Sequence, residues 1–265
     1  MTDISKNAIP QSPSSINEIL IDASITNSLR SLRKAFFWIF FGLILSLIPL
    51  ADIAGVIILL VGIILLIIAL GDMGKTKLHS ANAMKSARNW ILVYLLIGIV
   101  ISITAVVAVI FTLSSPTTYI PGLGSQVTSV QARASTLLTG TIMAVFIPLE
   151  IAGLVVGLIA YIRLSQSLKI LGTELSVRKI FNAGRYLIYS IIVTAVGSIA
   201  SVVFIFGYSA FVLIRGTDYI SSVVALLPLI AVPLIVLLVG VILEIIAFHS
   251  AYSGIDDFFL KKSMT

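Results

Sequence analysis

The chain has 265 residues, of which 59% are hydrophobic and only 11% are charged, whereas soluble domains carry about 25% charged residues. This composition predicts an integral membrane protein. The absence of cysteine excludes disulfides, iron–sulfur clusters and Cys-ligated zinc, and two histidines are too few for most histidine-based metal sites. The net charge of +6 would favour nucleic acid in a soluble protein. Here the basic residues lie between apolar spans, so we expect no nucleic-acid partner.

The chain begins with a polar stretch that gives way to an amphipathic pattern. Residues 1–14 contain two prolines and no apolar run, which is typical of a flexible tail. Apolar residues at helical spacing then continue through Leu29 and Leu32, beside a group of basic residues. Residues 1–34 are therefore predicted to form a flexible tail followed by a cytoplasmic amphipathic helix on the membrane face.

Apolar runs long enough to cross a bilayer fill the region from residue 35 to residue 251, since about 20 residues suffice for a helical span. We place six spans at roughly 35–51, 53–71, 90–113, 136–162, 186–214 and 220–248. The cytoplasmic tail is expected over residues 252–265, where Asp256 and Asp257 indicate a solvated turn. A weak ion site at these two carboxylates is the alternative.

Lys and Arg residues are distributed very unevenly between the two sides of the six spans. Of 17 basic residues, only Arg133 and Arg215 fall in the segments opposite the N-terminus. The positive-inside rule therefore predicts that both termini are cytoplasmic, in a multi-pass protein of the plasma membrane. The connection from Leu164 to Arg185 has leucines at helical spacing among its basic residues, so it is predicted to be a surface helix attracted to anionic lipid, or a docking site for a partner.

Short matches relate the spans to one another. Val-Gly pairs end at Gly62, Gly157 and Gly240 in spans two, four and six, while Ser102 of span three matches Ser198 of span five at a nearly equal offset. The simplest interpretation is three related hairpins of the same orientation. Chance matching in helices rich in Ile, Val and Gly is the alternative. The sequence thus predicts an all-α, polytopic integral membrane helix bundle with six transmembrane helices.

One family resemblance accompanies these features. A polar N-terminus followed by SLRSLRKAFFWIFFGLIL, then VGIILLIIAL and a short basic loop, resembles the uncharacterised multi-pass membrane proteins of crenarchaeal archaea. The resemblance covers most of the chain but depends on hydropathy and loop style. It implies an archaeal plasma membrane and carries no activity.

Glu150 is the candidate for intramembrane chemistry, because it lies near the middle of span four, two residues after Pro148. A carboxylate at this depth is costly unless it is paired, solvated or protonated. It would form a proton- or cation-binding site, or a protonated structural acid that donates a hydrogen bond to a hydroxyl of a neighbouring span. The candidate hydroxyls are those of Ser102, Thr104, Thr194 and Ser198.

Arg163 and Glu244 are predicted to lie at similar depth on the cytoplasmic side, where an ion pair would close the base of the bundle. The alternative is a cytoplasmic gate. Neither this pair nor Glu150 completes a Ser/His/Asp set, a pair of midplane acids or a metal triad, so we expect neither an enzyme nor a cofactor. The function predicted is a structural or accessory subunit of a plasma-membrane complex, and the partners expected are membrane lipids and other proteins or further copies of the chain. A small transporter or channel that uses Glu150 is the alternative.

Overall fold

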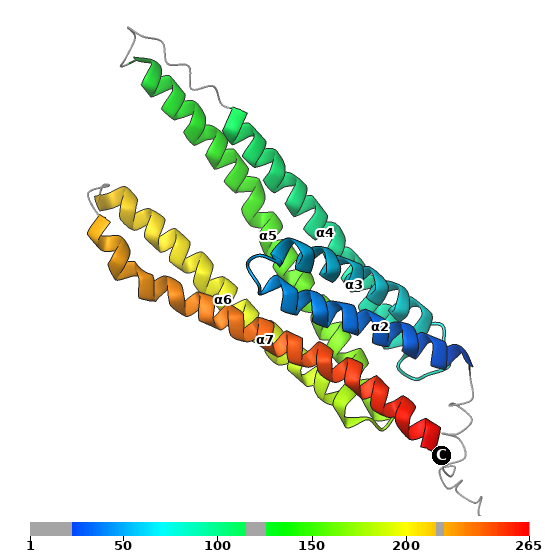
Figure 1. The fold of residues 1–265 in the computed structure, drawn as a ribbon. Coiled ribbons are helices and arrows are strands. Elements are labelled where there is room, and N and C mark those ends of the chain that lie inside the picture. The colour runs from blue at the N-terminus through cyan, green and yellow to red at the C-terminus, as the bar shows by residue number, and fades with distance from the viewer. Residues whose placement is uncertain (1–22, 115–125, 216–219, 265) are drawn as a thin grey trace, which may run out of the picture. The chain divides into compact units, whose positions relative to one another are not determined.

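The computed structural model describes the backbone of residues 23–114, 126–215 and 220–264, and side chains for residues 23–107, 148–149, 151–201 and 231–264. This part of the chain is all-helical and contains no strand. The prediction of an all-α protein is therefore confirmed. Its helices, labelled as in Figure 1, are α2 (Ala23–Ser46), α3 (Asp52–Met73), α4 (Ala81–Ser114), α5 (Gln126–Glu174), α6 (Arg178–Arg215) and α7 (Ile220–Met264).

Five of these helices contain segments long and apolar enough to cross a membrane. The segments are Asp52–Met73, Ala81–Val107, Ile151–Glu174, Arg178–Ser201 and Ala231–Met264. Large hydrophobic side chains remain exposed along them, as at Ile57 of α3, Ile103 of α4 and Ile235 of α7. Because exposed apolar surface on this scale is unfavourable in water, the helices indicate a multi-pass protein embedded in a bilayer.

α2 differs from the other helices in its apolar length. Its apolar part begins at Ala35, after Arg33 and Lys34, and the helix ends at Ser46 rather than continuing through the predicted span 35–51. These residues extend only about 18 Å at 1.5 Å per residue, against about 30 Å of bilayer hydrocarbon. Residues 47–51 form the turn into α3, in which Leu50 is fully exposed.

The chain divides into two compact units, of which unit 2 is the simpler. Unit 2 comprises Asn89–Ile162, where α4 and α5 form a hairpin. Small residues bring these helices together, since a Cβ added at Gly157 would lie 2.9 Å from the ring of Tyr94, and one at Gly153 would lie 3.0 Å from Ile101. Unit 2 is thus held by side chains of α4 that fill the space above glycines of α5.

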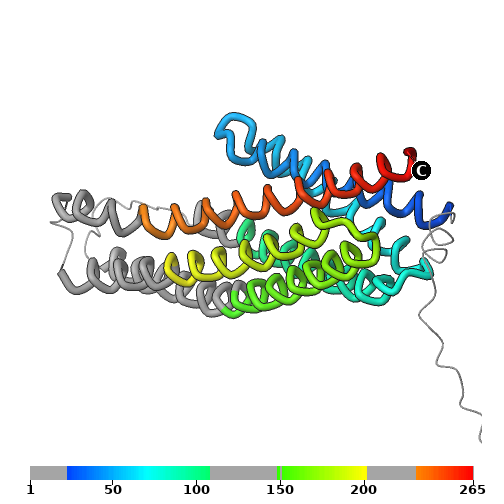
Figure 2. The backbone as a smooth tube through the Cα atoms, turned by 90° about the horizontal axis from the view of Figure 1, so that it is seen from below, coloured from blue at the N-terminus to red at the C-terminus, as the bar shows by residue number. Residues whose placement is uncertain are grey.

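Unit 1 comprises the rest of the chain, up to Arg88 and from Arg163 onwards. Within it, α2 packs against α3, α6 packs against α7, and α2 also packs against α7. Figures 1 and 2 show the antiparallel run of α6 beside α7. The first described helix therefore lies against the last one.

The most buried residues of unit 1 gather at one end, which we call the basic end and define as residues 23–36, 70–88, 163–187 and 248–264. Every helix contributes to this core, and its large side chains are almost fully inaccessible. They include Leu29, Leu32 and Phe36 of α2, Leu70 and Met73 of α3, Met84 of α4, Leu168 and Leu171 of α5, Ile180 and Leu187 of α6, and Ile255 of α7. Burial of such side chains stabilises the fold by about 1.5–3 kcal/mol each.

This core includes two stretches that the sequence predicted to be surface helices. Residues 23–34 are the first half of the continuous helix α2, with Leu29 and Leu32 both at 0% exposure. Likewise, the stretch from Leu164 to Arg185 is the end of α5, a turn and the start of α6. Because Leu164 and Leu168 face the protein core, the helical leucine spacing in this stretch marks internal packing, and the predicted membrane-surface helix is wrong.

The turn between α5 and α6 closes through a left-handed residue. Ser176 has a φ of 54°, while Val177 N–H donates to the carbonyl of Gly172 and Ser176 N–H donates to that of Thr173. This is the Schellman pattern that ends helices, in which the left-handed position is usually glycine. It returns the chain so that α6 packs directly on α5, where Ser165 Oγ donates to the carbonyl of Gly184 at 2.5 Å.

Candidate functional site

A carboxylate at the end of α5 holds the start of α4 at the basic end. Glu174 accepts hydrogen bonds from the backbone N–H of His79 at 2.6 Å and of Ser80 at 3.2 Å. Both N–H groups lie just before α4 begins at Ala81, where free amide donors and the positive end of the helix dipole favour an anion. Glu174 therefore joins two helices that lie far apart in the sequence.

Two ion pairs fix α7 to its neighbours at the same end. Arg33 Nε of α2 lies 2.5 Å from Asp256 Oδ1, and Lys179 Nζ of α6 lies 2.8 Å from Asp257 Oδ2. The interpretation of Asp256 and Asp257 as a solvated turn is wrong, because α7 remains helical to Met264. Consecutive residues on this helix point toward different partners, so α7 bridges α2 and α6.

Aromatic side chains gather just beyond these ion pairs, toward the apolar parts of α2 and α7. The ring of Phe37 lies 5.7 Å from that of Tyr252, and Phe40 lies 5.2 Å from His249. Trp38, beside Phe37, is 38% exposed. Exposed Trp and Tyr are typical of the boundary between hydrocarbon and headgroups. This aromatic group thus indicates where unit 1 enters the membrane.

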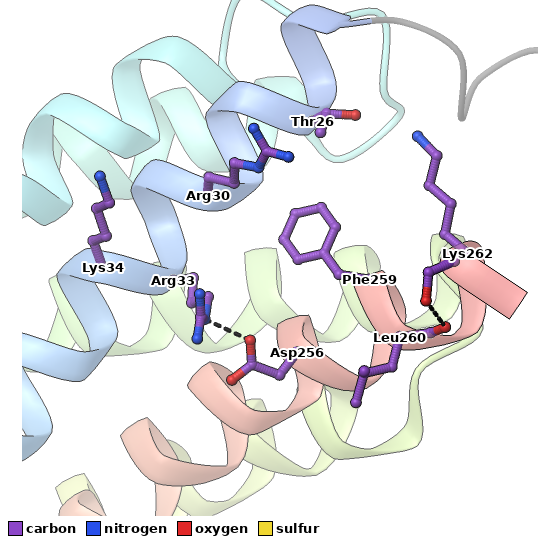
Figure 3. A pocket seen from close by; sticks show the side chains of 9 residues that line it. Thr26, Arg30, Arg33, Lys34, Asp256, Phe259, Leu260 and Lys262 are labelled. Carbon is purple, nitrogen blue, oxygen red and sulfur yellow. Dashed lines mark hydrogen bonds and ion pairs between the residues drawn. The ribbon is translucent and has the colours of Figure 1, made fainter.

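A pocket lies between α2 and α7, and the Arg33–Asp256 ion pair forms part of its wall (Figure 3). Its volume is about 750 Å³. Of the residues that the structure describes, four cationic side chains and one carboxylate contribute to its wall, together with apolar and hydroxyl groups. The lining residues are Thr26, Arg30, Arg33, Lys34, Asp256, Phe259, Leu260, Lys262 and Ser263.

The predicted polar site around Glu150 is divided between the two units. Ser102, Thr104 and Glu150 belong to unit 2, whereas Thr194 and Ser198 belong to unit 1. Ser102 Oγ donates to the carbonyl of Gly98 at 2.9 Å, and Thr104 Oγ1 donates to that of Val100 at 2.8 Å. Each of these hydroxyls thus donates its hydrogen bond to a backbone carbonyl one turn earlier in its own helix.

The backbone of Glu150 is helical within α5, but its side chain lies outside the described residues. The Glu150 site therefore stays a prediction. Thr194 faces α7, where a Cβ at Gly240 would collide with its hydroxyl. One turn earlier on α6, the buried Ser190 Oγ donates to the carbonyl of Gly240 at 3.0 Å. This part of α6 is close-packed against α7.

The predicted ion pair of Arg163 with Glu244 also stays a prediction. Both residues belong to unit 1, where Arg163 is exposed and Glu244 is half-buried. The ion pairs described above involve other residues, of which Asp256 and Asp257 were interpreted from the sequence as a solvated turn. The apolar spacing of Phe248, Ala251 and Ile255 was a signal that α7 continues past residue 251 and carries Asp256 into contact with α2.

Comparisons with known proteins leave the function open. A scan against protein-family models finds no match, and searches of curated proteins and of solved structures find no similar chain. Among the described residues, no group of three His, Asp or Glu side chains is placed to hold a metal ion. The fold and the apolar segments therefore define the class of protein, an all-helical, multi-pass membrane protein, and the residues of the basic end define its best-described site.

Proposed function

We propose that this chain is a non-catalytic accessory or structural subunit of a plasma-membrane complex. The observation that carries the proposal is the way polar groups are used at the basic end. Glu174, Asp256 and Asp257 each bind a group on another helix or helix start, as does the buried hydroxyl of Ser165. Polar side chains that bond to other helices of the same chain make the helix bundle rigid. A rigid bundle suits a subunit that positions other proteins in a complex.

The topology proposed for this subunit is six spans in three related hairpins, with both termini cytoplasmic. The glycine packing supports the repeat. Gly62 lies against Ile39, Gly157 against Tyr94 and Gly240 against Thr194, so each Val-Gly pair contacts the first helix of its own hairpin. The uneven distribution of Lys and Arg supports the orientation. The resemblance to crenarchaeal membrane proteins remains a prediction.

A small transporter or channel is the second candidate, and Glu150 favours it. An acid in the middle of an apolar span is typical of ion and proton pathways, and Pro148 interrupts the hydrogen-bond ladder of α5 nearby. The two candidates differ in what Glu150→Gln should do.

Two measurements on the full-length protein separate the candidates. Purified from its own membranes in mild detergent, a subunit is expected to retain a partner at a fixed ratio in native mass spectrometry. Reconstituted alone into vesicles, it should give no flux of protons, alkali cations or small acids. A flux that Glu150→Gln abolishes and the exposed-site control Asp72→Asn retains would overturn the subunit proposal in favour of transport.

A further inference from the structure

The pocket between α2 and α7 is strongly cationic. Arg30, Lys34 and Lys262 line it together with the ion pair of Arg33 and Asp256. Among the described residues of the wall, Asp256 is the one carboxylate and it pairs with Arg33, while Arg30 and Lys34 contribute two further positive charges. Such a wall favours an anion, and guanidinium and ammonium groups together suit the oxygens of a phosphate.

Two of the cations are held in place by aromatic rings. The guanidinium carbon of Arg30 lies 5.9 Å from the centre of the Phe259 ring, and that of Arg33 lies 5.6 Å from the centre of the Tyr252 ring. Figure 3 shows Arg30 and Phe259 on facing helices, with Arg33 directed toward Asp256. Because cation–π contacts and an ion pair restrict these side chains, less conformational entropy is lost when an anion binds.

The position of the pocket favours an anion that comes from the membrane. On α2, Lys34 is followed at once by the apolar segment and by the half-exposed rings of Phe37 and Trp38. On α7, Tyr252 stands one turn before Asp256. Since the aromatic group marks the membrane boundary, the pocket lies at the depth of the phosphate groups, and Phe37 and Trp38 offer apolar surface to the attached chains.

We propose that this pocket binds the phosphate group of an anionic membrane lipid, with Arg30 and Lys34 as its principal ligands. The bound headgroup would bridge α2 and α7 beside the Arg33–Asp256 pair, and so stabilise the contact between the first and last described helices. The proposal holds whether the protein serves as a subunit or as a transporter, because it depends only on the pocket and its depth.

The test measures thermal unfolding of the full-length, delipidated protein in detergent while a lipid is added. Phosphatidic acid is expected to raise the Tm in a saturable manner, whereas phosphatidylcholine is not. The double variant Arg30→Gln/Lys34→Gln should weaken the apparent affinity for phosphatidic acid by tenfold or more, since each lost charge-assisted hydrogen bond costs roughly that factor.

The matched control is Lys75→Gln/Lys77→Gln, which removes the same charge from the loop before α4, outside the pocket. It should retain the affinity for phosphatidic acid. An equal loss in this control would mean nonspecific charge attraction and would overturn the proposal, as would the absence of any Tm increase in the wild type. The single variant Lys34→Gln provides a milder change if the double variant does not fold, and a loss of affinity is expected there too.

Inorganic phosphate distinguishes a lipid from a soluble source. Added up to millimolar concentrations, it should neither raise the Tm nor displace phosphatidic acid. If inorganic phosphate stabilises the wild type as well as the lipid does, and the Arg30→Gln/Lys34→Gln variant loses both effects, the pocket is a site for free phosphate and the lipid proposal is wrong.

Discussion

At the scale of single residues, Glu174 is the side chain whose loss should weaken the basic end most clearly. It receives two backbone N–H groups at the start of α4, and the half-exposed site screens their interaction only in part. Glu174→Ala is expected to lower the free energy of unfolding by about 1–2 kcal/mol. The measurement is thermal unfolding in detergent, followed by circular dichroism.

Asp72 supplies the matched comparison for Glu174. Its carboxylate pairs with Lys75 one turn away at 3.2 Å, with both side chains well exposed. Exposed pairs of this kind contribute about 0–1 kcal/mol, so Asp72→Ala should change the Tm far less. If the two variants unfold alike, the role assigned to Glu174 at the start of α4 is refuted.

At the scale of helices, glycine contacts decide how closely the members of a hairpin pack. A Cβ at Gly62 would lie 2.7 Å from the backbone nitrogen of Ile39, whereas Gly98 has no atom within 4 Å of the corresponding position. Gly62→Ala must therefore push α2 away from α3 and should destabilise the protein by about 1–3 kcal/mol. Gly98→Ala should be neutral or stabilising by up to about 1 kcal/mol.

Unfolding of both glycine variants in the same detergent checks this expectation. The Tm is expected to fall for Gly62→Ala and to hold or rise for Gly98→Ala. Equal behaviour of the two variants would show that the approach of α2 to α3 is not fixed at Gly62, and would remove one of the three contacts that support the repeat.

The positions of the helices could be predicted from the sequence, but their ends could not. Apolar runs of bilayer length locate α3 to α7, because few other structures accommodate them. The continuation of α5 to Glu174 and of α7 to Met264 depends on burial against other helices at the basic end. In the sequence alone, the charged residues near the ends of these two helices have the pattern of a solvated tail, because the residues that they pair with are distant in the sequence. No local sequence pattern predicts the role of Glu174, because its hydrogen-bond partners His79 and Ser80 lie on a segment far away in the sequence.

At the scale of the whole molecule, the absence of cysteine makes the proposed topology directly measurable. Single cysteines at Ser114, the last residue of α4, and at Ser263, in the last turn of α7, should react differently with an impermeant maleimide. In intact cells we expect labelling of Ser114→Cys alone, with Ser263→Cys reacting only after permeabilisation. The reverse pattern would invert the orientation inferred from the basic residues.

Leu50→Cys extends the same measurement to the turn of the first hairpin. Six complete spans require this fully exposed residue to react from outside, as Ser114→Cys does. The short apolar part of α2 can cross the bilayer completely only if the Lys34 side chain extends toward the headgroups or the bilayer thins locally. Protection of Leu50→Cys in intact cells, with normal labelling in detergent, would show that the first hairpin stops within the membrane.

The packing of α2 against α7 also sets the order in which the protein can mature during synthesis. Phe36 of α2 contacts Phe248 of α7 with ring centres 5.8 Å apart, and Arg33 of α2 forms an ion pair with Asp256 of α7. Both partners on α7 are synthesised long after α2. At translation rates of roughly 5–20 residues per second, α2 must persist for on the order of 10–40 s before its partner leaves the ribosome. During that interval its buried face is available to membrane chaperones and quality-control proteases. A chain that terminates before Ile255 would keep Phe248 but lack Asp256 and the last turns of α7, so the first half of α2 would lose this part of its cover. Such a chain is expected to remain a substrate of these proteases.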